Sequence, residues 1–220
     1  MNNITISAAT AKKNYSFTCR KPKIISVPEI SKDAIIIDGE LKEYDHISPI
    51  TVDVLSPPDA KAWMAWTGDD DLSVKAWLAH DETKLYIAAL VKDDIHILDL
   101  NPRQMWKQDN LEFSIRAVDR IKDKSSFRFG IRKNVQQAYC WSSPVYPVGA
   151  RLDRVSYRVQ QKRNGITVYE IAIPFNDLKV SPETKELLEI RIGVWDCDTA
   201  GSIARYCRLL TFWNTRFILK

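Results

Sequence analysis

The amino-acid sequence predicts an all-β protein, an antiparallel two-sheet β-sandwich of jelly-roll-like type with very little helix. Apolar and polar residues alternate strictly in several short segments, for example 72–79, 110–116 and 126–132. This period of two is typical of a strand with one face in the core. The Asn164-Gly165 dipeptide adds a strong hairpin signal. About a dozen such segments against one convincing helix favour two packed sheets.

Along the chain, most expected strands are bounded by Gly, Pro, Asn or Asp, the residues that favour turns. The expected strands are 34–37, 51–55, 60–66, 72–79, 85–91, 110–116, 126–132, 136–141, 155–161, 166–173, 189–195, 205–213 and 217–219. The expected helix is 182–188, with Ser181 as its N-cap. The alternation places Glu112 and Arg128 on the faces of their strands that point away from the core.

The composition bounds the class of protein. With 220 residues, 45% hydrophobic and 27% charged, the chain suits one domain with a full core. The net charge is +4, but the 32 Lys and Arg are scattered, so no nucleic-acid partner is expected. No apolar run approaches the ~20 residues of a membrane span. The first residues lack a basic region followed by an apolar one, so no signal peptide is expected and the localisation stays open.

The chain divides into two parts. Residues 1–32 are polar and basic, and we expect an extended N-terminal arm that adds an edge strand or contacts a protein partner. Residues 33–220 are expected to form a single sandwich. The four cysteines show no metal-ligand spacing, and the sequence leaves open whether they are free thiols or include a Cys197–Cys207 disulfide.

Five separated segments together resemble one family, the family-nine carbohydrate-binding modules. They follow the family's order over about four-fifths of the chain, and they are Ile36–Tyr44, Leu85–Asp93, Trp106–Glu112, Tyr169–Pro174 and Val194–Asp198. The resemblance implies a non-catalytic β-sandwich that binds a mono- or oligosaccharide, often with structural calcium. It also implies an extracellular or cell-surface location.

The resemblance places the family's stacking tryptophan on Trp106, its carboxylate on Glu112 and its strand arginine on Arg128. An aromatic ring can cover the apolar face of a pyranose, while Glu and Arg hydrogen-bond its hydroxyl groups. The family's second tryptophan has no counterpart, because the loop that carries it is missing before the last strand. Trp195 is expected to supply an alternative ring, and the loop with Trp141 and Tyr146 is another candidate.

Simpler interpretations stand beside this site. Glu112 and Arg128 could form only a cross-strand ion pair, and Trp106 could only pack a loop onto the sheet. The alternative function is a structural or protein-interaction sandwich that has lost sugar binding. No nucleophile or general base stands out, so an enzyme is not expected. A haem site, known in the related DOMON superfamily, finds no support in the spacing of methionines and histidines.

Calcium is the cofactor that the family resemblance suggests. Asp93-Asp94 and Asp196-x-Asp198 are the candidate ligands, because Ca²⁺ takes six to eight oxygen atoms from carboxylates and carbonyls. No twelve-residue calcium loop is present. No cofactor is required by the sequence, and structural calcium is the expectation to test.

Overall fold

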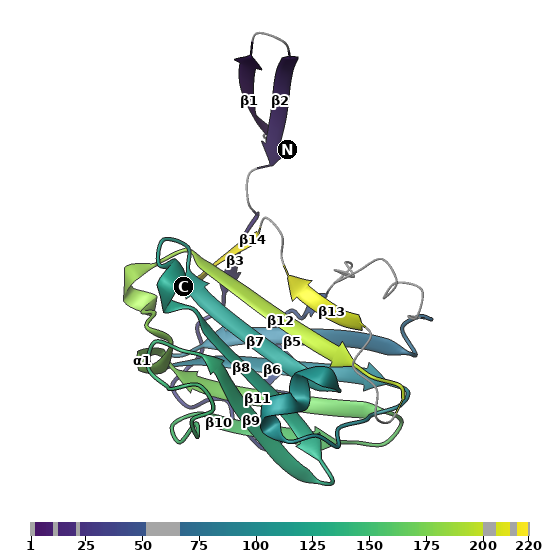
Figure 1. Cartoon of the computed structure of the whole chain (residues 1–220). Helices are drawn as coiled ribbons and strands as arrows, with labels where there is room; N and C mark the ends of the chain where they lie inside the picture. The colour runs from purple at the N-terminus through teal and green to yellow at the C-terminus, as the bar shows by residue number, and fades with distance from the viewer. Residues whose placement is uncertain are drawn as a thin grey trace.

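The structure, a computed structural model, describes residues 3–10, 13–20, 23–51, 67–199, 206–211 and 215–219. It gives the side chains of residues 23–50, 67–199 and 216–219. In this part of the chain, strands form two large sheets that face each other, with short helical turns at their ends (Figure 1). The predicted all-β sandwich is therefore confirmed.

One sheet has five strands among the described residues, in the order β10-β11-β6-β5-β4, and all neighbours run antiparallel. Their bounds are β4 Ile50–Thr51, β5 Leu72–His80, β6 Lys84–Asp93, β10 Ser156–Gln161 and β11 Ile166–Pro174. The hairpin between β10 and β11 turns at Asn164 and Gly165, both with positive φ, as the Asn-Gly dipeptide predicts. The strand expected at 60–66 and most of the one at 51–55 lie outside the described residues.

The other sheet has the order β3-β14-β12-β7-β8-β9, and β13 also pairs with β12. The bounds are β3 Lys23–Val27, β7 Asn110–Ala117, β8 Ser125–Arg132, β9 Val135–Ser142, β12 Leu188–Asp196, β13 Tyr206–Thr211 and β14 Thr215–Leu219. Its neighbours are antiparallel apart from β14 and β3, which run parallel. We call it the seven-stranded sheet.

The core lies between the two sheets and follows the alternation in the sequence. In β7 the inward residues Leu111, Phe113 and Ile115 are at most 1% exposed. The inward residues of β5 and β8 are buried in the same cluster, and they are Leu72, Val74, Ala76, Leu78, Phe127, Phe129 and Ile131. The residues that alternate with these in β7 and β8 therefore lie on the outer face of the seven-stranded sheet.

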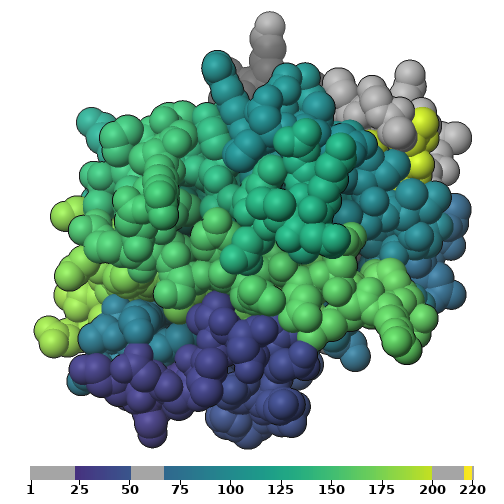
Figure 2. Space-filling model, turned by 90° about the horizontal axis from the view of Figure 1, so that it is seen from below, coloured from purple at the N-terminus to yellow at the C-terminus, as the bar shows by residue number. Residues whose placement is uncertain are grey.

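The N-terminal region contributes more than an extended arm. Strands β1 (Asn3–Thr10) and β2 (Lys13–Arg20) pair with each other, and β3 joins the edge of the seven-stranded sheet. The chain then crosses the outer face of the five-stranded sheet, and in Figure 2 its purple and dark-blue atoms lie against green atoms of β10 and β11. Whether the sandwich begins at residue 33 as a domain boundary stays a prediction.

The strand expected at 34–37 is wrong. These residues are irregular, and Ile35 packs with Tyr44 against Tyr86 on the outer face of the five-stranded sheet. The backbone N–H groups of Asp38 and Gly39 donate to the Glu170 carboxylate of β11. A β-branched run therefore covers a sheet here instead of extending one.

The helix expected at 182–188 is also wrong. Only a 3₁₀ turn, η5 (Pro182–Thr184), forms there, and it ends at Lys185, which has a positive φ of 49°. The short α1 (Phe175–Leu178) follows β11, where the sequence indicated only the end of a strand. Three further 3₁₀ turns are η1 (Lys42–Tyr44), η3 (Pro102–Lys107) and η4 (Ile121–Asp123). None of the helical segments in the described ranges is long and apolar enough to span a membrane.

Candidate functional site

Three of the four residues that the sequence predicts for the site lie together on the outer face of the seven-stranded sheet. Glu112 in β7 is directly opposite Arg128 in β8, and Gly193 in β12 is opposite Glu112 on the other side. Trp195 is two residues beyond Gly193 and therefore on the same face. Because Gly193 carries no side chain, the space beside Glu112 is open for the Trp195 ring to lean toward it.

Glu112 joins the cluster through a single oxygen atom. Its Oε2 accepts hydrogen bonds from Arg128 Nε at 3.1 Å, Arg128 Nη2 at 2.8 Å and Trp195 Nε1 at 3.2 Å. Its other oxygen, Oε1, has no hydrogen-bond partner among the described residues, and the side chain is 21% exposed. A charged acceptor therefore points from the cluster toward solvent, held in place by its neighbour.

Aromatic rings flank the arginine. The Arg128 guanidinium lies 4.8 Å from the centre of the Trp141 ring and 5.8 Å from that of Trp195. Tyr139 packs edge-on against Trp141, with 5.5 Å between ring centres. Trp141 reaches this position through an irregularity in the pairing of β8 with β9, where Phe127 pairs with Cys140 and Ser126 with Ser142. Trp141 was an alternative in the sequence; Tyr139 was missed, although alternation along 136–141 could have found it.

Trp106, the expected platform, lies apart from this cluster. It is half-buried in η3, with the Lys107 ammonium 5.4 Å from its ring centre. No hydrogen bond or ring contact joins it to Glu112, Arg128 or Trp195 in the described part of the chain. The turn η3 packs on β8 and β9.

Gly130 lets η3 approach the sheet. A Cβ atom at this position would lie 2.6 Å from Leu98 Cδ2 and 3.6 Å from Met105 Sδ. Gly130 is two residues beyond Arg128, so η3 with Trp106 covers the same outer face beside the cluster. Trp106 thus belongs to a turn that covers this face, and it is not a direct neighbour of Glu112 in the described part of the chain.

A second cluster consists of carboxylates at the ends of strands from both sheets. Asp93 ends β6, Asp109 precedes β7 and Asp196 ends β12, and oxygen atoms of Asp93, Asp196 and Asp198 lie within 4.8 Å of one another. Two further groups in the same range join it, and they are Asp93, His96 and Asp109, and Asp71, Asp94 and Asp198. The sequence named Asp93, Asp94, Asp196 and Asp198, and missed Asp71, Asp109 and His96, which only tertiary contacts add.

The chemistry of this cluster fits a divalent cation. Asp109 is 2% exposed and its Oδ1 has no hydrogen-bond partner, although it is buried. Burial, followed by the negative charges of Asp93 and Asp196, raises the pKa of Asp109 to about 10. Carboxylates that repel one another in a buried place are stabilised by a bound cation, and oxygen ligands are those that calcium prefers.

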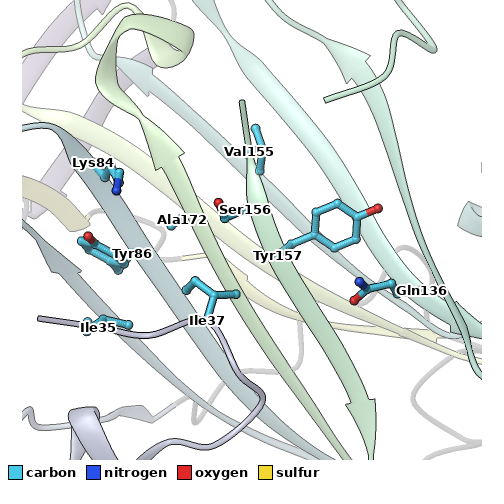
Figure 3. A pocket seen from close by; sticks show the side chains of 9 residues that line it. All are labelled: Ile35, Ile37, Lys84, Tyr86, Gln136, Val155, Ser156, Tyr157 and Ala172. Atoms are coloured by element: carbon cyan, nitrogen blue, oxygen red, sulfur yellow. The ribbon is translucent and has the colours of Figure 1, made fainter. Parts of the chain in front are cut away.

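The structure also contains a groove of about 520 Å³ beside β10 (Figure 3). Ile37 and Tyr157 line it, and three of its polar groups already have partners. Lys84 Nζ pairs with Asp33 at 2.6 Å, Tyr86 Oη donates to Asp81 at 2.8 Å, and Gln136 Oε1 accepts from the backbone of Val159 at 3.1 Å. The groove holds none of the predicted site residues.

A β-sandwich that gathers tryptophans, an arginine and a partly exposed carboxylate on one outer sheet face has the architecture of a ligand-binding module. The family comparison gives the same class. The profile of the carbohydrate family 9 binding domain-like family matches residues 44–208, so the chain belongs to this family. No curated protein sequence matches the chain.

Solved structures share the fold at low sequence identity. One is a family 9 carbohydrate-binding module from Caldicellulosiruptor kristjanssonii in complex with glucose, with a TM-score of 0.64 and 16% identity over 90% of this chain and 96% of that chain. Another is a family 9 module from the same organism in complex with cellotriose, with a TM-score of 0.58 and 17% identity over 90% of this chain and 94% of that one.

Proposed function

We propose that this chain is a non-catalytic module that binds a mono- or oligosaccharide on the outer face of the seven-stranded sheet. The observation that carries the proposal is the cluster of Glu112, Arg128 and Trp195, with Trp141 beside it. Glu112 Oε1 accepts a hydrogen bond from one sugar hydroxyl, and the Arg128 guanidinium donates a hydrogen bond to a second hydroxyl. The tryptophan rings cover the apolar face of the pyranose.

Family membership and the known ligands of similar structures support this proposal. The two modules from C. kristjanssonii hold glucose and cellotriose. We therefore infer a β-linked glucose unit as the first ligand to test. Trp106 belongs to the proposal as a second ring, at the wall that η3 forms beside the cluster.

The same proposal includes a structural calcium ion. Asp93, Asp109 and Asp196 would hold it, with Asp198 at the exposed side. A bound calcium ion supplies positive charge that offsets the repulsion between these carboxylates. Because these carboxylates stand at strand ends of both sheets, their binding to one ion would link the two sheets.

The test is a titration of intrinsic tryptophan fluorescence with glucose and cellotriose, in calcium and then in chelator, with Kd measured by calorimetry. We expect saturable binding with Kd between micromolar and millimolar, about −8 to about −4 kcal/mol. Glu112→Gln and Trp195→Ala should each weaken binding by about tenfold or more, since each removes a direct ligand contact. Trp106→Ala tests whether the Trp106 ring in η3 contributes to sugar binding.

The matched control is Trp77→Phe. Trp77 is half-buried on the outer face of the other sheet, where its ring centre lies 6.2 Å from that of Tyr44, so sugar binding should persist in this variant. If neither sugar changes the spectrum at tens of millimolar, sugar recognition is excluded and the alternative, an interaction scaffold, takes its place. A protein partner for the N-terminal arm stays a prediction.

A further inference from the structure

A small basic hollow lies on the same sheet face as the Glu112 cluster. It has a volume of about 180 Å³. Ser114, two residues beyond Glu112 in β7, lies at its floor, and its charged walls are Arg116, Lys124, Glu189 and Arg191. Ser114 is opposite Arg191 in β12 and opposite Ser126 in β8. The hollow therefore continues the row of outward side chains that begins at Glu112.

The walls carry more positive than negative charge. Arg116 Nε donates to Glu189 Oε2 at 2.6 Å, and Arg216 pairs with the other oxygen of Glu189 at 3.1 Å. Glu189 is thus already shared by two arginines. Within the described ranges, the side chains of Lys124 and Arg191 have no ion pair. Two cations therefore border the hollow without a counter-charge of their own.

Lys124 is the more informative of the two because it is half-buried. Burial lowers its pKa, and the positive charges of Arg191 and Arg116 lower it further, while the negative charges of Glu112 and Glu189 act in the opposite direction. A partly buried cation beside other cations is costly unless an anion joins it. Its backbone is held in place, since Ser142 Oγ donates to the Lys124 carbonyl at 2.9 Å.

The position of the hollow relative to the sugar cluster fits one ligand. A strand rises about 3.4 Å per residue, so Ser114 is about 7 Å from Glu112 along β7. This is of the order of the length of one sugar ring. A saccharide that places a ring on the Glu112 cluster can therefore place a substituent of the next ring in the hollow.

We propose that the hollow binds the carboxylate of a uronic-acid unit, and that the ligand of this chain is an acidic oligosaccharide. The inference rests on the proposed sugar-binding function and names its substrate class. Arg191 offers a planar pair of donors to the carboxylate, Lys124 a point charge and Ser114 a hydroxyl donor. No covalent step is involved.

The experiment compares two ligands that differ only in the group concerned. Calorimetry measures binding of cellotriose and of cellotriose whose C6 hydroxymethyl groups are oxidised to carboxylates, at roughly 20 mM and about 500 mM NaCl. We expect the oxidised ligand to bind the native chain about tenfold more tightly at low salt, about 1.4 kcal/mol. The preference should shrink at high salt, because part of it is electrostatic.

The variants distinguish binding of the carboxylate in the hollow from a general electrostatic attraction of the acidic ligand to a basic protein. Lys124→Met and Arg191→Gln should each remove most of the preference, while the affinity for neutral cellotriose stays within about twofold. Lys122→Met is the matched control: it removes the same charge two residues away, at an exposed site outside the hollow, and should leave the preference intact. Thermal melting checks that each variant folds.

Each outcome decides between the proposals. If cellotriose binds and the oxidised form binds no more tightly, the inference is overturned and the proposed function stands. A preference that survives both Lys124→Met and Arg191→Gln, or that falls equally in Lys122→Met, also overturns it. If only the oxidised ligand binds, the inference stands and neutral-sugar recognition fails. If neither ligand binds, both are overturned.

Discussion

Arg128 is held by charge and by stacking at the same time. Two of its nitrogen atoms donate to Glu112 Oε2, and its planar group lies 4.8 Å from the Trp141 ring centre. Its side chain is only 8% exposed. Lysine could match the charge of this group, but neither the paired donors nor the flat surface that stacks on a ring.

We therefore expect Arg128→Lys to weaken binding of cellotriose about tenfold and to lower the free energy of unfolding by about 1 kcal/mol. Calorimetry and urea denaturation measure the two effects. Arg151→Lys is the control, because the Arg151 side chain is 91% exposed and pairs with Asp153. An Arg128→Lys variant that binds like the native chain would remove this arginine from the site.

Glu170 is a buried carboxylate on the outer face of β11. It is 0% exposed and accepts the backbone N–H groups of Asp38 and Gly39, so it fastens the covering N-terminal segment to the sheet. Burial raises its pKa to about 7 from an ordinary value of 4.5. Between these two pH values, the folded chain binds more protons at this group than the unfolded chain does.

The contribution of Glu170 to stability is consequently present below about pH 4.5 and is lost as the pH rises to about 7. We expect the free energy of unfolding of the native chain to fall across this window, by up to about 3 kcal/mol from this group. Glu170→Gln cannot titrate, so its fall over the same window should be smaller. Urea denaturation at about pH 5 and about pH 7.5 tests this. An equal fall in the free energy of unfolding between the two pH values in both proteins would refute it.

At the scale of elements, the β10–β11 hairpin controls the position of Asp93. Gly165 has a φ of 69°, and a Cβ atom there would lie 2.1 Å from the Asp93 carbonyl oxygen. The Asp93 N–H in turn donates to the Gly165 carbonyl at 3.0 Å. The turn of one hairpin is thus in contact with a proposed calcium ligand on β6.

Gly165→Ala should lower the free energy of unfolding by about 2–3 kcal/mol, because the backbone conformation is unfavourable for alanine and the new methyl group meets a carbonyl. Calcium affinity should fall as well, since Asp93 must move. Asn164→Ala, in the same turn with a φ of 59°, faces mainly the backbone penalty, about 1–2 kcal/mol. Denaturation with and without calcium measures both variants, and equal losses would contradict the contact.

For the whole molecule, the acidic cluster joins the two sheets. Asp93 belongs to the five-stranded sheet, whereas Asp109 and Asp196 stand at strand ends of the seven-stranded sheet. A cation among them would bind the folded chain and not the unfolded one. Its binding free energy then adds to the stability of the entire sandwich.

We expect calcium at a hundredfold its Kd to stabilise the native chain by about 2.7 kcal/mol, and chelator to remove this gain. Asp109→Asn should lose most of the calcium response. It should also be about as stable as the native chain in chelator near neutral pH, because burial and the neighbouring carboxylates raise the pKa of Asp109 to about 10, so its side chain is already uncharged without the ion. Asp119→Asn, at an exposed position, is the control. If the melting temperature measured by calorimetry is the same with calcium and with chelator, the proposed calcium site is refuted.

Much of the fold could be predicted because the information is local. The alternation along β5, β7 and β8 gave the core residues, and it placed Glu112 and Arg128 together on the outer face. The helix at 182–188 was wrong because Lys185 adopts a left-handed conformation that ends the turn. The strand at 34–37 was wrong because Glu170, far along the chain, takes the backbone donors of Asp38 and Gly39.

The sequence by itself determined the sandwich class, the inward faces of its main strands and the two charged residues that meet across β7 and β8. A period of two is a property of each strand alone, and it survives whatever packs against it. Only the tertiary structure decided that Trp141 flanks Arg128, that Asp109 joins Asp93, and that Lys124 and Arg191 border one hollow. These contacts depend on the register of the strands, on the irregular pairing of β8 with β9 and on the packing of the two sheets. Each of these is determined by residues that are distant in sequence.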